Sequence, residues 1–275
     1  MCIRDRNKGL DFSIDYVKRF NNDFDMSFKG TFTYAHNKVL EYDEPDFQKY
    51  PNISRVGHSV DQQLLYIAER LFIDDSEVQR NPKQNLGGWV SGGDIKYKNL
   101  PDVNGNYDNV IDSNDRQYTG MPTTPEIVYG FGPSFRYKKF DFSFFFQGAA
   151  RVSIMMNGIH PFGAEGIRNV LQFIADDYWS ETNQNIYAEY PRLSKRDNEN
   201  NTKASTYWQR NGAFLKLKNL EVGFNHKFFR VYLRGSNLLT FSPFKYWDPE
   251  MGSGSGLSYP TQRVFNVGVQ FSINK

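Results

Sequence analysis

Oxygen-bearing side chains crowd the segment 104–115, where their spacing matches that of a calcium-binding loop. In such a loop several side chains, one backbone carbonyl and a closing carboxylate place about six to eight oxygens around one ion. Asn109 stands where the turn glycine is usual, but asparagine tolerates left-handed backbone. The alternative is a surface turn stabilised by Asn and Asp side chains that needs no ion. The candidate calcium ligands are Asn104, Asn106, Asp108, Val110 (through its carbonyl), Asp112 and Asp115.

Aromatic residues in polar surroundings form a second set of candidates. An exposed aromatic ring offers a flat apolar face, and neighbouring Asn, Gln and Arg side chains can orient a ligand by hydrogen bonds, as a sugar ring would require. The alternative is a belt of Trp and Tyr at the level of membrane headgroups, which we favour for Trp208 because it lies close to a predicted strand. The candidate ligand-binding residues are Trp89, Tyr207, Trp208, Tyr246 and Trp247.

No arrangement of residues in the sequence predicts catalysis. The four histidines are scattered, and the sequence contains no HExxH motif, no G-x-S-x-G elbow and no phosphate-binding P-loop. The single cysteine excludes a disulfide framework, and a formal net charge of +2 gives no bulk field for binding nucleic acid. We therefore expect neither an enzyme nor a nucleic-acid-binding protein.

Alternation of apolar and polar residues with a period of two is the main structural signal in the 275 residues. Aromatic residues make up 16% of the chain, yet its mean hydropathy is only -0.64. This combination is explained if rings and polar groups alternate along strands, as they do in the segment that begins at Phe24. The pattern predicts strands at 9–20, 24–36, 126–137, 140–152, 213–225, 229–240 and 261–274.

The length of these strands favours a membrane over a soluble core. A strand of eleven residues at about 3.3 Å per residue reaches roughly 36 Å, which is enough to cross a hydrocarbon layer about 30 Å thick at a tilt. A soluble β-sandwich also alternates, but its strands average only about five to six residues. We therefore predict an all-β protein, an antiparallel transmembrane β-barrel whose apolar face contacts the lipid bilayer.

The connections between the predicted strands are either very short or very long. Turns at 21–23, 138–139 and 226–228 alternate with long connections at about 40–124, 156–210 and 241–260. Outer-membrane barrels have short periplasmic turns and long extracellular loops, and an even number of strands. Seven strands therefore predict a C-terminal fragment of a larger barrel at 9–275, preceded by a stub at 1–8 that lies outside the domain. Spacings of three and four from Ile167 to Tyr178 predict one helix in the second long loop.

Several motifs in order along the chain resemble those of one family. They are Gly93-Asp94-Ile95-Lys96-Tyr97, Gly120-Met121-Pro122, Tyr190-Pro191-Arg192-Leu193, Phe214 to Leu220, Gly235 to Phe241 and Asp248-Pro249-Glu250. The sequence is similar here to the SusC/RagA-type TonB-linked outer-membrane receptors. The resemblance implies a barrel of about 22 strands, of which this chain supplies the last seven. It also implies a plug that lies outside this sequence and contacts TonB.

The resemblance further implies an importer in the outer membrane that takes up an oligosaccharide or a peptide. A surface lipoprotein of the SusD type would close over its loops. Two alternatives remain open at this point. A passive outer-membrane porin or adhesin would show the same alternation, and a soluble, calcium-stabilised carbohydrate-binding β-domain would show the same loops.

Overall fold

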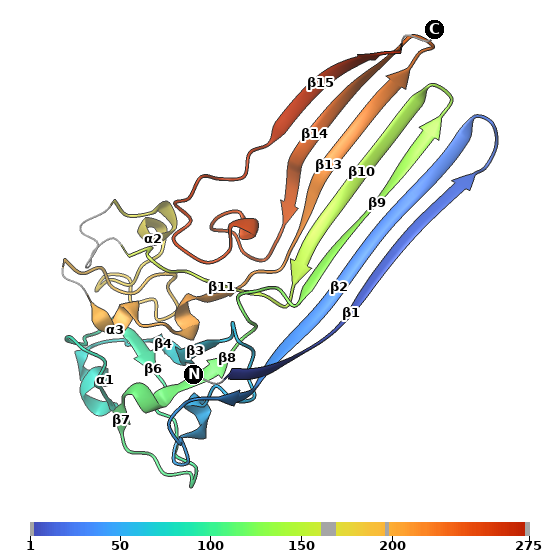
Figure 1. Ribbon diagram of the computed structural model, residues 1–275. Helices are drawn as coiled ribbons and strands as arrows, with labels where there is room; N and C mark the ends of the chain where they lie inside the picture. Colours follow the sequence, from blue (N-terminus) through green and yellow to red (C-terminus); the bar gives the residue numbers. More distant parts are fainter. Residues whose placement is uncertain (1–2, 161–168, 196–197, 273–275) are drawn as a thin grey trace.

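The computed structural model describes residues 3–160, 169–195 and 198–272. The chain forms two regions, a large sheet of long strands and a folded region at one end of that sheet (Figure 1). We call the second region the loop module, because it consists of the three long connections between the strands of the sheet, residues 43–126, 151–213 and 242–263.

The large sheet has seven strands in the order β1-β2-β9-β10-β13-β14-β15, and all neighbours are antiparallel. These are the seven strands that the alternation predicts, and short turns and long connections alternate as expected. Among the described residues, β1 and β15 each have a single partner, so the sheet is open at both edges. The strands are β1 (Ile3–Arg19), β2 (Phe24–Tyr42), β9 (Ile127–Tyr137), β10 (Phe140–Ala150), β13 (Phe214–Asn225), β14 (Phe229–Phe241) and β15 (Val264–Phe271).

The first two strands are longer than their sequence pattern indicates. β1 begins at Ile3, and residues up to Lys8 pair with β2 as far as Tyr42. Residues 3–8, which we expected to form a stub outside the domain, therefore continue the first strand, although charged residues hide their alternation. β15 is shorter than predicted at its start, since it begins at Val264 rather than at 261.

One face of the large sheet is apolar and exposed. Phe12 on β1 is 55% exposed and Val267 on β15 is 77% exposed, and no second sheet covers them in the part of the chain that the structure describes. In a water-soluble sandwich these side chains would be sealed between two layers. A single layer with large apolar side chains on its open face instead calls for an apolar environment outside the protein.

The opposite face of the sheet carries paired charges near the short turns. Arg136 on β9 donates to Asp25 on β2 at 2.6 Å, and Arg230 on β14 bridges Asp141 on β10 at 2.5 Å and Glu221 on β13 at 2.6 Å. The first pair joins the neighbouring strands β2 and β9, and the second set joins the three successive strands β10, β13 and β14. Asp141 is thus held in an ion pair with Arg230, and we find no second carboxylate paired with it for acid–base chemistry among the described residues.

The loop module contains only short elements. Its strands pair in twos, and its helices span at most two turns, because the chain here has no long stretch of one period. The strands are β3 (Gln63–Tyr66), β4 (Ala68–Leu71), β5 (Lys83–Gln84), β6 (Ile95–Tyr97), β7 (Val110–Ile111), β8 (Arg116–Thr119), β11 (Ser153–Met155) and β12 (Gln209–Asn211). The helices are α1 (Asp75–Arg80), α2 (Gln172–Asp176) and α3 (Glu199–Thr202), with 3-10 turns at Pro51–Ile53, Ser113–Asp115, Thr206–Trp208 and Pro249–Met251.

The helix predicted between Ile167 and Tyr178 is present in part, as α2 with Ile174 buried, while 161–168 lie outside the described residues. None of the helices that the structure describes is both long and apolar enough to cross a membrane.

The three connections of the loop module fold onto one another rather than extending separately. Backbone amides join the first connection to the second, where Tyr66 N donates to Ala204 O at 3.1 Å, and the second to the third, where Gly254 N donates to Met155 O at 2.9 Å. A continuous cluster of buried apolar residues is drawn from all three. The loop module therefore has a core of its own, separate from the exposed apolar face of the sheet.

Candidate functional site

A buried carboxylate organises the loop module. Asp94, which is completely buried, accepts hydrogen bonds from the side chains of Asn198 and Asn201 at 2.9 Å each and from Ser91 N at 2.8 Å. The guanidinium of Arg192 forms an ion pair with it at 2.7 Å. Burial raises the pKa of Asp94 against the opposing effect of Arg192. These five residues come from three separate segments, so the carboxylate ties the segments together.

The residues that flank Asp94 in the motif Gly93-Asp94-Ile95-Lys96-Tyr97 also have structural roles. Gly93 has φ +79, and a Cβ there would lie 2.2 Å from the ring of Trp179, so the position requires glycine. Ile95 is fully buried, and the hydroxyl of Tyr97 donates to Asn200 O at 2.7 Å. The Gly-Asp-Ile-Lys-Tyr motif therefore builds the core of the loop module and does not line a ligand site.

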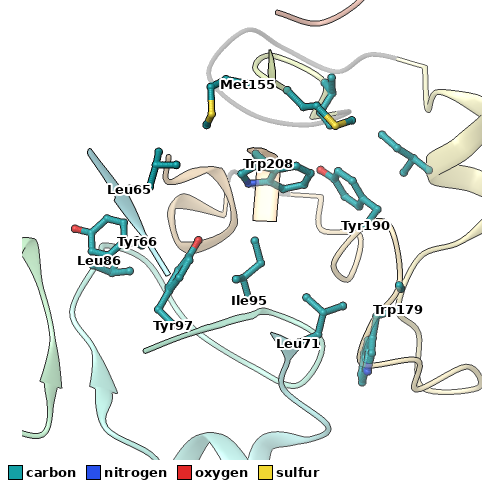
Figure 2. Packing of buried hydrophobic residues seen from close by; sticks show 14 of the residues in the cluster. Leu65, Tyr66, Leu71, Leu86, Ile95, Tyr97, Met155, Trp179, Tyr190 and Trp208 are labelled. Atoms are coloured by element: carbon teal, nitrogen blue, oxygen red, sulfur yellow. The ribbon is translucent and has the colours of Figure 1, made fainter. Parts of the chain in front are cut away.

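Trp208 lies at the centre of this core (Figure 2). Figure 2 shows its ring between Leu65, Ile95 and Tyr190. It is 2% exposed, and its indole Nε1 donates to Asn201 O at 2.8 Å. The ring of Trp208 is thus covered, and it is available neither to a ligand nor to a membrane-headgroup belt in this structure.

Three adjoining cavities open on the surface of the loop module. Three of the other aromatic residues predicted to bind a ligand line them. The first, of about 220 Å³, is lined by Tyr207, and the second, of about 560 Å³, by Tyr246. Glu189 and Arg210 line both and so separate them. The third cavity, of about 280 Å³, is lined by Trp247, and it shares Phe244 and Lys245 with the second. Together they form a groove, which we call the loop groove.

A polar node stands between the first two cavities of the loop groove. Arg210 Nη2 donates to Glu189 Oε2 at 3.2 Å, and the Tyr246 hydroxyl donates to the same carboxylate oxygen. Burial, and then the hydrogen bond to Glu189, raise the pKa of Tyr246. Tyr207 donates to Ala188 O at 2.6 Å, and burial raises its pKa as well. Both phenols therefore remain protonated donors at neutral pH.

The node could not be predicted from the sequence. Glu189 precedes the motif that begins at Tyr190, and Arg210 follows Trp208, but no spacing relates the two charges. The two charges meet because β12 lies beside the 185–190 segment in the folded chain. The cavities that they line are formed by the same contact between distant segments.

Trp89 lies apart from the loop groove. Its ring is 70% exposed, and the guanidinium of Arg192 stacks over it at 4.5 Å from the ring centroid. Arg192 thus contacts Asp94 with one edge and Trp89 with its face. Of the five predicted aromatic residues, the structure brings three together in the groove, buries Trp208 and leaves Trp89 on a separate surface.

The predicted calcium loop is folded through its own hydrogen bonds. The two oxygens of Asp115 accept from Leu100 N and Asp112 N, each at 2.7 Å, and Asp108 accepts from Val110 N at 3.0 Å. Asn109 has φ +59, so it adopts the left-handed backbone expected at the turn position. Within the described residues, no three His, Cys, Asp or Glu side chains are grouped so as to hold a metal ion. Calcium binding at this loop stays a prediction.

Relatives of known name match nearly the whole chain. TonB-dependent receptor P3 of Formosa agariphila is 28% identical over 96% of this chain, and TonB-dependent receptor P26 of the same organism is 27% identical over 96%. TonB-dependent receptor SusC of Bacteroides thetaiotaomicron is 24% identical over 96%. The chain spans only 28%, 28% and 26% of the lengths of these three proteins. No family model matches the chain.

Solved structures show the same fold. The RagAB peptide importer in its open-open state matches 98% of this chain with a TM-score of 0.69 and 19% identity, and the chain covers 29% of the matched structure. The closed-closed state matches 97% of the chain with a TM-score of 0.66 and 20% identity, again over 29% of its chain. These findings confirm that this chain is similar, over nearly its whole length, to the TonB-dependent receptors of the SusC/RagA type.

Proposed function

We propose that this chain forms part of the wall and of the extracellular loops of a TonB-dependent nutrient importer in the outer membrane. The observation that carries the proposal is the single-layer sheet of long strands with an exposed apolar face, since only a lipid environment suits that face. The similarity to TonB-dependent receptors supports the same function. The sheet would then be one part of a closed barrel, with its paired charges directed to the lumen.

The two ends of the sheet differ as this proposal requires. The turns that join β1 to β2, β9 to β10 and β13 to β14 lie at the end remote from the loop module (Figure 1). Outer-membrane barrels place short turns in the periplasm and long loops outside the cell. The loop module and its groove would therefore face the external medium, where a nutrient arrives.

The partners follow from the proposed family. TonB would supply energy through a plug that is not part of this sequence, and a SusD-like surface lipoprotein would cover the loop module. The nutrient would be an oligosaccharide or a peptide. One solved relative is described as a peptide importer, and the aromatic and charged lining of the loop groove suits either class.

Import can be tested in the native bacterium. We expect deletion of the gene, or of TonB, to abolish uptake of the same labelled nutrient, because the receptor and its energy source act in one step. Uptake that needs the gene but persists without TonB would instead indicate a passive porin. Recovery of the protein in the aqueous fraction without detergent would contradict both membrane functions and favour a soluble domain.

A further inference from the structure

The third cavity of the loop groove differs from the other two in its charge. It lies at the extracellular end of β14 and is bounded by the 242–249 segment and by the residues that lead into β15. Three cationic side chains line it: Lys216, Lys245 and Arg263. What each of these cations is paired with decides what the cavity can bind.

Lys216 is already neutralised. Its side chain is buried, and its Nζ lies 2.5 Å from Asp248 Oδ2 and 2.8 Å from Glu250 Oε2. Burial alone would raise the pKa of Asp248, but the hydrogen bond from Lys216, the hydrogen bond from Glu250 N and the charge of Lys216 together outweigh it and lower the pKa. Asp248 is therefore ionised and offsets this charge, so it does not compensate the other two cations. Lys218 also contacts Glu250, at 2.8 Å, which saturates that carboxylate.

Lys245 and Arg263 have no such partner. Within the part of the chain that the structure describes, neither forms an ion pair or a hydrogen bond, and both side chains remain exposed at the cavity. Two uncompensated cations on one cavity of about 280 Å³ attract an anionic group. Arginine in particular binds planar or tetrahedral oxyanions through two parallel hydrogen bonds.

Neutral polar residues also line the same cavity. Asn237 lines the cavity with φ +55, and its Nδ2 donates to Gln262 O at 3.0 Å, which fixes the orientation of the amide. Its Oδ1 is buried and has no hydrogen-bond partner. This oxygen has almost no accessible surface, so a ligand in the cavity cannot reach it, and Asn237 shapes the wall rather than holding the ligand. The hydroxyls of Thr240 and Thr261 line the same wall.

We propose that this cavity binds an acidic sugar residue of the imported ligand, with its carboxylate or sulfate held by Lys245 and Arg263 and its ring against Trp247. The inference rests on the proposed import function and narrows its substrate to acidic oligosaccharides. A sugar suits the site better than a peptide, because it carries its anionic group on a ring that can lie against the aromatic face of Trp247, which lines the same cavity.

Binding to the purified full-length receptor tests the proposal. The probes are an oligogalacturonate, a sulfated galactose oligosaccharide, an uncharged oligosaccharide of the same length and a short polyglutamate peptide. The variants are Lys245→Gln and Arg263→Gln. Lys227→Gln is the control, because that exposed lysine lies at the short turn between β13 and β14, far from the cavity.

We expect the wild-type receptor to bind at least one acidic sugar about tenfold more tightly than the uncharged one, and each variant to lose about tenfold for that sugar alone. Which acidic sugar responds distinguishes carboxylate from sulfate. Equal binding of all sugars, unchanged binding in both variants, or a response confined to the peptide would overturn the proposal. TonB-dependent uptake of an uncharged nutrient would leave the import function standing even then.

Discussion

The large sheet and the loop module bury their apolar residues in opposite ways. In the sheet, rings on alternate residues point outward and stay exposed, while charges pair on the other face. In the loop module, rings point inward around Trp208, and a buried carboxylate, Asp94, ties the segments together. The proposed function explains this difference, because it places lipid outside the sheet and water around the loop module.

The largest effect that tests this comparison is removal of the ring at the centre of the module. Trp208→Ala would leave a cavity among residues that pack from three segments, and such a change costs about 3–5 kcal/mol. We expect hydrogen exchange of the loop-module amides to accelerate, while exchange in the large sheet stays slow, because the two regions have separate cores. Trp89→Ala is the control, since that ring is exposed. Equal acceleration in both regions would mean that the module has no independent core.

The second effect concerns the outward face of the sheet. Phe28 lies on the apolar face of β2 and its neighbour Lys29 on the polar face. We expect Phe28→Arg to lower the free energy of unfolding in a lipid bilayer by about 2–4 kcal/mol, as a cation near the middle of the hydrocarbon layer does. Lys29→Ala, the matched change on the other face, should cost little. Denaturant titration of the receptor in vesicles measures both, and equal tolerance at the two positions would contradict a lipid-facing surface.

The third effect is the pH dependence of the module. Glu77 in α1 accepts from Arg70 at 2.5 Å, from Ile73 N at 2.9 Å and from Lys96 at 3.2 Å. Burial alone would raise its pKa, but these donors together lower the pKa to about 2. A carboxyl with a lowered folded-state pKa stabilises the fold above its unfolded pKa of about 4.3 and loses that contribution as the pH falls toward 2.

We therefore expect the local stability around α1 to fall by up to about 3 kcal/mol between about pH 4.5 and 2. Glu77→Gln should reduce this dependence, because its amide does not titrate in this range. Hydrogen exchange of the 68–97 amides at several pH values is the measurement. A wild type and a variant with the same pH profile would show that other acids control the transition.

The sequence predicted the sheet far better than the module, and the reason is physical. A strand with one apolar and one polar face must alternate, so each of the seven strands carries its own local signal. The loop module carries no such local signal. Asp94 pairs with Arg192, which lies 98 residues further along the chain, and no periodic pattern relates the segments that meet there. Alternation missed residues 3–8 of β1, where charges replace rings, and it placed the start of β15 at 261 rather than at Val264.

In the candidate site, too, the sequence predicted some residues and missed others. Aromatic type and position outside the strands identified Tyr207, Tyr246 and Trp247, which line the loop groove. The same criterion also selected Trp208, which is buried. Residue type alone does not distinguish an exposed ring in a loop from a ring buried where several loops pack together. Glu189, Arg210 and Lys245 were missed, since their importance depends on which surfaces the folded connections bring together.

The smallest expected effect concerns calcium at 104–115. The sequence pattern predicts Asp115 as a calcium ligand, whereas in the structure Asp115 accepts hydrogen bonds from backbone amides. Both oxygens of Asp115 hold backbone amides, so an ion would have to displace at least one of these hydrogen bonds. Any net stabilisation would consequently be modest, about 1.4 kcal/mol at a calcium concentration ten times the dissociation constant. A calcium site predicts that this gain saturates, is reversed by a chelator and is lost in Asp108→Asn, while Asp11→Asn on β1 has no effect. Thermal unfolding of the receptor with and without calcium measures the gain. A transition that calcium and chelator leave unchanged would show that backbone amides, rather than an ion, hold the carboxylates of this loop.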